Sequence, residues 1–307
     1  GRRHHRGSLK PPGRFDRHGS TRRAQRRCRA TSPAVLDKES ELLWWLAYIA
    51  LGLFSGFFAG MLGIGGGLVM VPTLALMFAA QAAFPSTEVL HLALGTSMAA
   101  ILFTSLASLR EHHRHGAVLW QIVGQITPGI LAGTLLGTLF AARVPARPLA
   151  LFFTVFVCLV AVQMILNLKP KPSRELPGAV GMFAVGTGIG AISSLVAIGG
   201  GSLTVPFLTW CNVRVQHAIG TSAAVGFPLA LGGSLGYIFN GWEHTGLPPG
   251  SLGYVYLPAL LWLVPSSMLI APFGARLAHR LPVATLKRLF AGVLILLAGK
   301  MLWSLFG

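Results

Sequence analysis

Ten runs of apolar residues follow one another between residues 44 and 305, and they constrain the fold more than any other feature of the chain. A helix needs about 20 apolar residues to cross the hydrocarbon core of a membrane. Nine runs are long candidates, at about 44–62, 68–84, 90–109, 117–142, 149–168, 178–197, 218–239, 252–277 and 283–305. The tenth, at about 202–212, is too short to cross alone. The sequence therefore predicts an all-α polytopic membrane protein with about 8–10 transmembrane or re-entrant segments.

Charge is concentrated in residues 1–43, which hold 12 of the 25 Lys and Arg residues. This segment has almost no large apolar residues, so we predict a disordered basic tail, either dispensable or an upstream extension. A transit peptide, an anchor for anionic lipids and a nucleic-acid-binding arm are alternatives. The segment lacks an amphipathic stripe and interleaved aromatic residues, which argues against the transit peptide and the nucleic-acid arm.

Two stretches of the apolar region have nearly the same sequence. "MLGIGGGLVMVP" at 61–72 and "LVAIGGGSLTVP" at 195–206 align glycine on glycine and proline on proline, at an offset of 134 (206 − 72). The GTS triplets at 95–97 and 220–222 follow in the same order. Later residues, such as Pro128 and Pro265, match at an offset of 137. The sequence predicts two homologous halves, residues 44–170 and 171–307, each with a glycine-rich broken helix.

Glycine triplets at corresponding positions of two halves indicate where a substrate binds in secondary transporters. A helix that restarts after such a break presents unpaired N–H groups and the positive end of its dipole, which suit an anion. Close helix packing is the alternative explanation for membrane glycines. Ala197 stands where the first motif has Gly63, which weakens the case for identical backbone geometry in the two copies. The predicted substrate-binding glycines are Gly65, Gly66, Gly67, Gly199, Gly200 and Gly201.

Hydroxyl side chains near the triplets can donate to an anion without carrying charge, although such groups also bond to helix carbonyls. The predicted substrate-binding hydroxyls are Ser202, Thr96, Ser97, Thr221 and Ser222. His91 and His217 precede the two GTS triplets and are candidates for proton coupling. A helix-end structural role is the alternative for both histidines.

The acidic residues are expected at segment ends or in loops, which favours anionic over cationic cargo. Among them is Glu111, in the stretch "REHHRHG", which we expect to be a solvated loop. Two membrane layouts fit the basic loops. Five crossings per half give inverted repeats, whereas four crossings with a re-entrant glycine segment give parallel repeats.

Other classes of function have weaker support. Cys28, Cys158 and Cys211 form no metal-ligand spacing, so we expect no metal and no cofactor. No nucleotide-binding motif such as G-x-x-x-x-G-K-[ST] is present, so an ion gradient, a membrane potential or a separate subunit would energise transport. A passive channel stays open as an alternative. An intramembrane hydrolase using Ser222 and His217 is disfavoured because a spacing of five does not place them on one helix face. We therefore expect no catalytic residues and no enzyme activity.

Two copies of an apolar G-x-G-G-G-x-x-x-V-P motif, "GIGGGLVMVP" and "AIGGGSLTVP", each followed by GTS, resemble the TauE/SafE family of sulfite exporters and organosulfonate permeases. The resemblance covers about residues 44–305 and has no counterpart for the basic tail. It implies a transporter of a small anion, such as sulfite, an organosulfonate or a related sulfur-containing anion, in the bacterial cell (inner) membrane. The expected partners are that anion and the lipid bilayer, with no nucleic acid. The oligomeric state stays open.

Overall fold

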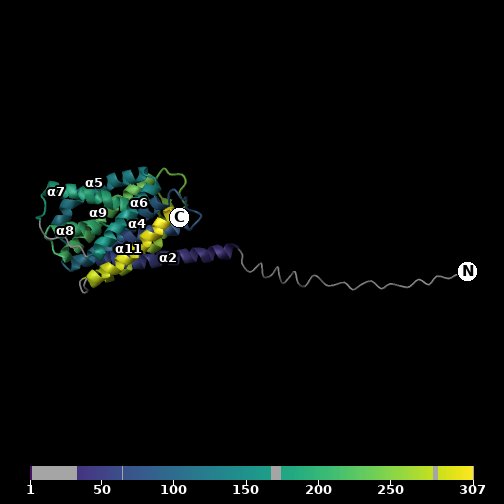
Figure 1. Ribbon diagram of the computed structural model, residues 1–307, viewed down its shortest axis with the longest axis horizontal. Coiled ribbons are helices and arrows are strands. Elements are labelled where there is room, and N and C mark those ends of the chain that lie inside the picture. The colour runs from purple at the N-terminus through teal and green to yellow at the C-terminus, as the bar shows by residue number, and fades with distance from the viewer. Residues whose placement is uncertain (2–32, 64, 167–173, 279–282, 307) are drawn as a thin grey trace. The chain divides into compact units, whose positions relative to one another are not determined.

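The computed structural model describes residues 1, 33–63, 65–166, 174–278 and 283–306. The described residues form helices joined by short connections, with one small hairpin before α10 (Figure 1). In chain order the elements are α2 (Pro33–Leu62), α3 (Gly67–Ala79), α4 (Val89–Arg114), α5 (Trp120–Arg143), α6 (Ala146–Ile165), α7 (Ala179–Val196), α8 (Gly201–Trp210), α9 (Val215–Gly241), β1 (Ser251–Leu252), β2 (Val255–Tyr256), α10 (Leu257–Ala278) and α11 (Val283–Phe306).

The helical membrane fold that the apolar runs predict is confirmed. Seven of the helices in the described ranges are long and apolar enough to cross a membrane: α2, α4, α5, α6, α7, α9 and α10. Helix α11 has 24 residues. The run at 68–84 departs from the prediction, because its helix α3 has only 13 residues, or about 20 Å of rise. Neither α3 nor the 10-residue α8 is long enough to span about 30 Å of hydrocarbon.

The structure describes less of the predicted tail than of the membrane region. Residues 2–32 of the tail lie outside the described residues, and α2 begins at Pro33, so residues 33–43 are helical. Residues 45–307 form one compact unit.

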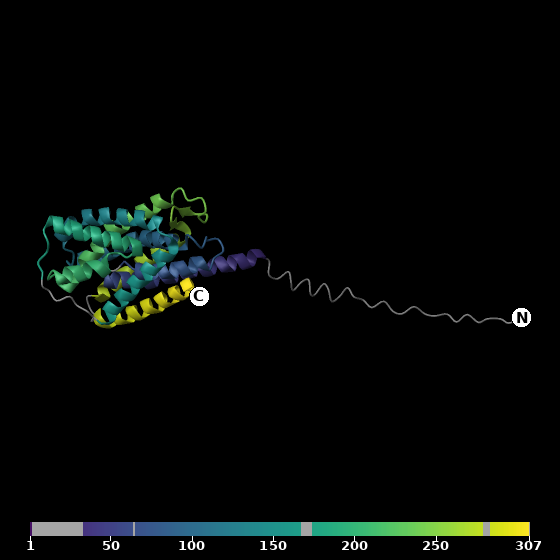
Figure 2. The same cartoon turned by 45° about the horizontal axis from the view of Figure 1, so that its top comes forward.

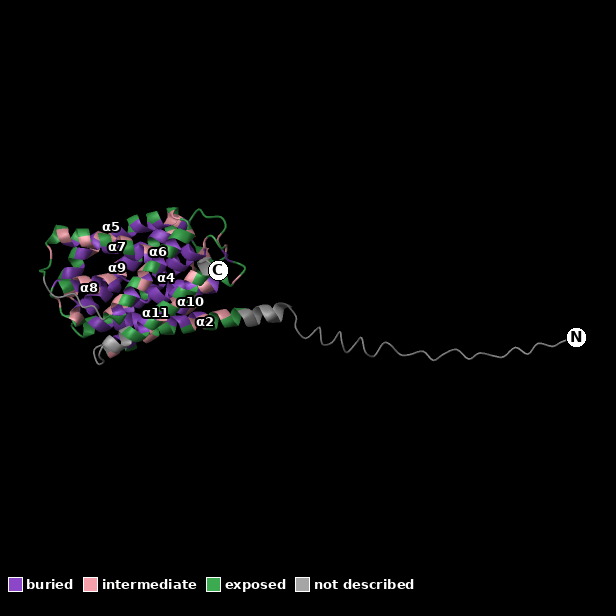
Figure 3. Ribbon diagram, in the orientation of Figure 1, coloured by how far each residue is buried: buried purple, intermediate pink, exposed green. Residues whose placement is uncertain are grey.

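Helices α4 and α9 form the centre of the compact unit. Within their apolar windows 83% and 67% of the residues are buried, against 33–44% for the other five long apolar helices. The outer helices carry exposed residues along one side (Figure 3), and on α5 these include Leu136 and Phe140. Large apolar side chains on the outside of a membrane protein face the lipid.

Glycines let two pairs of helices approach closely. In the first pair, a Cβ added to Gly56 of α2 would lie 2.5 Å from the carbonyl oxygen of Ser267 in α10. In the second, a Cβ on Gly186 of α7 would lie 2.5 Å from the carbonyl oxygen of Ile126 in α5. Figures 1 and 2 both show α5 and α7 side by side. Small residues at such contacts are the usual way in which membrane helices pack backbone to backbone. Each pair joins an N-terminal helix with a C-terminal one, so residues on both sides of 170 are interleaved.

The helix bounds repeat at the offsets of the sequence motifs. Helix α3 begins at Gly67 and α8 at Gly201, an offset of 134 (201 − 67). Helix α5 begins at 120 and α10 at 257, and α6 at 146 and α11 at 283, both offsets being 137. Helices α4 and α9 begin 126 residues apart (215 − 89). The order of long and short helices is therefore the same in the two parts of the chain.

Candidate functional site

The two glycine-rich segments, from Gly63 to Gly67 and from Ala197 to Gly201, lie against each other in the compact unit. A Cβ added to Gly65 would lie 2.7 Å from the Cα atom of Gly199. A Cβ added to Gly67 would run into the carbonyl oxygen of Ala197. Residues about 134 positions apart thus make backbone contact, and side chains at these glycines would push the two segments apart.

Left-handed backbone conformations end the helices at corresponding positions of the two segments. Gly63 has φ +65° and Gly66 has φ +80° in the first, and Ala197 has φ +45° and Gly200 has φ +80° in the second. Only glycine adopts this region without cost, and a residue with a Cβ loses about 1–2 kcal/mol there. Gly65 also has φ +76°, whereas its counterpart Gly199 has no positive φ, so the two segments differ at that pair. Ala197 nevertheless has a positive φ like Gly63. The reservation raised by the sequence is not supported at this position.

Both short helices begin at these segments with a glycine N-cap. Gly66 caps α3 and Gly200 caps α8, and neither contributes a side-chain hydrogen bond to the first turn. The carbonyl oxygen of Gly66 accepts from Val69 and Met70, and that of Gly200 accepts from Leu203 and Thr204. The helix starts are therefore formed by main chain alone, and each has the positive end of a helix dipole at its glycines.

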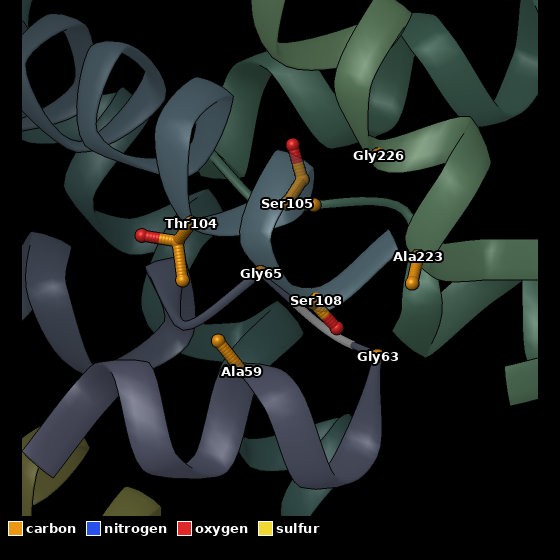
Figure 4. A pocket seen from close by; sticks show the side chains of 9 residues that line it. Ala59, Gly63, Gly65, Thr104, Ser105, Ser108, Ala223 and Gly226 are labelled. Atoms are coloured by element: carbon orange, nitrogen blue, oxygen red, sulfur yellow. The ribbon is translucent and has the colours of Figure 1, made fainter. Parts of the chain in front are cut away.

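A small pocket lies where the two segments meet α4 and α9 (Figure 4). It holds about 190 Å³ of space, and in this conformation its gaps are too narrow for a water molecule. Its lining residues come from α2, both glycine segments, α4 and α9: Ala59, Gly63, Gly65, Thr104, Ser105, Ser108, Gly199, Ala223 and Gly226. None of these lining residues carries a charge.

The polar side chains of the pocket all come from α4. Thr104 bonds to the Ala100 carbonyl oxygen and to the Ser267 hydroxyl, at 2.9 Å each, and Ser105 donates to the Leu102 carbonyl oxygen. The Ser108 hydroxyl is buried and has no hydrogen-bond partner among the described residues. In Figure 4 it points toward Gly63. A buried hydroxyl without a partner costs free energy, which a ligand in the pocket would recover.

The structure places the two predicted threonines at helix starts and not in this pocket. The Thr96 hydroxyl accepts a hydrogen bond of 2.9 Å from the Tyr256 N–H, just before α10. The Thr221 hydroxyl accepts one of 3.0 Å from the Leu119 N–H, just before α5. Leu119 and Tyr256 are 137 residues apart (256 − 119), the offset of α5 and α10. Both threonines therefore satisfy a backbone donor that the helix itself leaves unpaired.

Replacing Thr221 by Val should lower stability and leave substrate affinity unchanged. The substitution keeps the shape of the side chain but leaves the Leu119 N–H without its acceptor, at a cost of about 1–3 kcal/mol. Heating purified variants and following the loss of folded protein measures the first effect, and substrate competition measures the second. Thr96→Val is expected to behave in the same way, and weakened substrate binding in either variant would place these threonines in the site.

Three other predicted hydroxyls are buried beside the glycine segments or within α4. Ser222 donates to the Ile219 carbonyl oxygen at 2.8 Å and to that of Gly63 at 3.4 Å, so it supports the first glycine segment. Ser97 and Ser202 are buried and have no hydrogen-bond partner among the described residues. None of the three lines the pocket of Figure 4. Ser193 and Thr204 are buried and without a described partner in the same way.

The two predicted histidines differ in their surroundings. The Nε2 atom of His91 lies 3.1 Å from the Ala141 carbonyl oxygen, and its Nδ1 atom lies 3.5 Å from the Glu88 carboxylate. Its ring also lies against Tyr254. The Nδ1 atom of His217 is buried without a hydrogen-bond partner among the described residues. A carbonyl oxygen can only accept, so the hydrogen bond to Ala141 uses a proton on Nε2 of His91.

Sequence reasoning missed the polar face of α4. Thr104, Ser108 and Glu111 follow at spacings of four and three, which places them on one side of a helix. The prediction of a solvated loop at "REHHRHG" was wrong for its first residues. Glu111 lies in the last turns of α4, buried, and receives a hydrogen bond of 3.1 Å from Arg276 of α10. His112 is also buried and bonds to the Gly60 carbonyl oxygen. The helical spacing was the signal that could have revealed this.

Comparisons with known proteins agree with this architecture. The family model described as "Sulfite exporter TauE/SafE" matches residues 48–301. A "Probable membrane transporter protein" of Haemophilus influenzae is 38% identical over 258 residues, which cover 82% of this chain and 96% of the relative. A "Probable membrane transporter protein" of Xylella fastidiosa is 32% identical over 267 residues, covering 83% and 94%. The "Probable membrane transporter protein YdhB" of Bacillus subtilis is 28% identical over 250 residues, covering 79% and 92%.

No solved structure matches the chain. The family match nevertheless spans nearly the whole compact unit, including both glycine segments and the pocket between them. Together with seven helices able to span a membrane, it shows that this is an integral membrane transporter for a small molecule. The chain belongs to the TauE/SafE sulfite exporter family.

Proposed function

We propose that this transporter carries a small sulfur-containing anion, such as sulfite or an organosulfonate, and binds it between the two glycine segments. The proposal depends on one observation. Gly63 and Gly65 of the first segment and Gly199 of the second, far away in sequence, line one pocket together with α4 and α9. In secondary transporters the site lies where interrupted helices of two repeats meet near the middle of the membrane.

The chemistry of the pocket favours an anion. Helices α3 and α8 begin at the glycine segments, so the positive ends of two helix dipoles are close to the bound molecule. Ser108 adds a hydroxyl donor, and no carboxylate lines the pocket to repel negative charge. Glycine at positions 65 and 199 leaves the backbone open to the ligand. The uncharged lining would bind a small anion weakly enough to release it.

We also propose that residues 44–170 and 171–307 are homologous halves. The repeated offsets of the helix starts support this, as does the equivalent bonding of Thr96 and Thr221. Because α3 and α8 are too short to span the membrane, the lengths favour four crossings per half with a short re-entrant helix. In that layout the halves are parallel.

The substrate class comes from the family, because the names of the relatives give none. The matching family is described as a sulfite exporter, and the relatives only as probable membrane transporters. Sulfite carries a compact charge that hydroxyl and backbone donors can bind from several sides. We include His91 and His217 in the proposal as the groups that would couple transport to protons. The position of the His91 ring, 3.5 Å from the Glu88 carboxylate, supports this role.

Uptake of radiolabelled sulfite into proteoliposomes tests the proposal. We expect saturable uptake that responds to an imposed proton gradient and is reduced by unlabelled substrate analogues. Thiosulfate, sulfate, sulfoacetate and taurine as competitors would rank the substrates. Flux that never saturates would favour a passive channel instead. Complete absence of flux for all these molecules would contradict the proposed substrate class.

A further inference from the structure

An ion pair between a buried acid and a half-exposed base lies beside the glycine pocket and does not line it. Glu111 of α4 accepts a hydrogen bond of 3.1 Å from the Nε atom of Arg276 in α10. The Glu111 side chain is only 10% exposed, whereas that of Arg276 is 51% exposed. The Glu111 carboxylate is therefore held inside the protein, and the Arg276 side chain reaches it from the surface.

The pair lies near the pocket, with Glu111 on the lining helix α4 and Arg276 on α10, which packs against α2. Glu111 follows Ser108 by three residues on α4, so it stands one turn beyond the unpartnered hydroxyl. Gly60 follows the pocket residue Ala59, and its carbonyl oxygen lies 3.2 Å from the Nε2 atom of His112. A Cβ on Gly60 would also lie 3.0 Å from the backbone nitrogen of Ala275, the residue before Arg276. The ion pair thus ties α4 to α10 at the edge of the pocket.

We propose that Glu111 and Arg276 form a charge-pair gate at this end of the pocket, and that Arg276, once released, is the residue that attracts the anionic substrate. This rests on the proposed function, since it assumes that the pocket binds an anion. In the structure the pair is formed, with the Nε atom of Arg276 3.1 Å from the Glu111 carboxylate, which corresponds to the closed state of the gate. An oxyanion offers the guanidinium the same acceptor atoms as a carboxylate, so it can replace Glu111 as the partner of Arg276.

Glu111 keeps other partners when Arg276 leaves. The Nη1 atom of Arg114 lies 3.9 Å and the Nδ1 atom of His115 4.0 Å from its carboxylate, both on α4 itself. A buried carboxylate left without a partner would be costly, and the Arg114 guanidinium, although 80% exposed, reduces that cost. The Arg276 guanidinium in turn lies over the ring of Phe273 at 5.0 Å, which holds it near the gate without a carboxylate. When the ion pair opens, Glu111 and Arg276 therefore each keep a neighbouring group.

A thiol placed at Ser108 reports on the gate without any need for transport. We would replace Cys28, Cys158 and Cys211 by Ala and introduce Ser108→Cys, which nearly preserves the shape of the side chain. The purified protein in detergent is then treated with two methanethiosulfonate reagents of similar size, one with a sulfonate and one with a quaternary ammonium group. The rate of labelling measures access to the pocket, and the ratio of the two rates measures its preference for anions.

The gate predicts a different result for each partner. Glu111→Gln should speed labelling by the anionic reagent about tenfold, because it frees Arg276 and opens the pocket. Arg276→Gln should also speed labelling but abolish the preference for the anionic reagent. The exchanged pair, Glu111→Arg with Arg276→Glu, should return labelling to the slow parent rate. Arg110→Gln, which removes a charge one residue from Glu111, is the matched control and should change neither rate.

Two results would overturn the proposal. If Glu111→Gln and Arg276→Gln both label at the parent rate, the ion pair is not a gate. If Arg276→Gln keeps the anion preference of Glu111→Gln, Arg276 does not attract the substrate. These outcomes are separate from the failure of sulfite uptake, because a gate that responds in this assay while no anion is transported would contradict the proposed function alone.

Discussion

Gly200→Leu is expected to reduce the initial rate of anion uptake at least about 100-fold, while the amount of protein in the membrane stays unchanged. Gly200 caps α8 with φ +80°, a conformation that costs a residue with a Cβ about 1–2 kcal/mol. The nearest atoms to an added Cβ, on Leu229 and Thr204, are 3.4 Å away, so a methyl group fits but a full leucine must displace its neighbours. The change therefore alters the helix start at the proposed site and not the packing of long helices.

Gly200→Ala should reduce the initial rate of anion uptake by no more than about tenfold, because only the backbone preference of residue 200 changes. Gly188→Leu is the matched control, since a Cβ at Gly188 of α7 meets no atom within 4 Å. Gly66→Leu should also abolish uptake, but its Cβ would lie 2.9 Å from the Ser55 carbonyl oxygen of α2, so it disturbs a long helix as well. Uptake by Gly200→Leu at the rate of Gly188→Leu would show that the substrate binds elsewhere. Loss of the Gly200→Leu protein from the membrane would favour a packing role.

The sequence predicted the positions of the helices well, because long apolar runs leave few alternatives. Each of the ten runs contains one helix, and the short run at 202–212 corresponds to the short helix α8. The length of α3 was not predictable from hydrophobicity alone. Its apolar run continues to Phe84, but the chain leaves the helix after Ala79, and Phe84 packs its ring against Phe78. Apolar composition does not distinguish a continuing helix from a loop that folds back on it.

The glycine segments could be predicted as a pair, but their neighbours could not. A repeated motif identifies positions that are equivalent, and here these positions also contact each other, as Gly65 and Gly199 do. The threonines of the GTS triplets repeat just as clearly, yet they bond to backbone before α5 and α10. Repetition therefore indicates shared geometry without distinguishing a ligand-binding role from a structural one. The proposed gate shows the converse, because neither Glu111 nor Arg276 belongs to a repeated motif.

The two proposed halves differ in the polarity of their central helices. On α4 the pocket is lined by Thr104, Ser105 and Ser108. At an offset of 125 these residues correspond to Leu229, Ala230 and Gly233 of α9, none of which carries a hydroxyl. The polar side chains that line the pocket thus come from α4 and not from α9. This asymmetry favours a substrate path along the C-terminal half of α4, toward Glu111.

Gly133→Leu should prevent stable assembly of the helices, whereas Gly124→Leu on the same helix should have little effect. A Cβ at Gly133 of α5 would run into the Thr187 carbonyl oxygen of α7 and lie 2.9 Å from the Ala191 backbone nitrogen. Backbone atoms cannot move aside as a side chain can, so α5 and α7 must separate, at a cost of about 3 kcal/mol or more. At Gly124 an added Cβ meets no atom within 4 Å.

The measurement is the fraction of monodisperse protein that remains after heating in detergent, read by size-exclusion chromatography. We expect the midpoint of Gly133→Leu to fall by at least about 6 °C, if the variant can be purified at all, and that of Gly124→Leu to stay within about 2 °C of the parent. Equal midpoints would mean that α5 and α7 do not rely on close backbone contact. The contrast with Gly200→Leu separates two uses of glycine in this protein, since a leucine in the helix pair should destroy the fold, and a leucine at the helix break should destroy only transport.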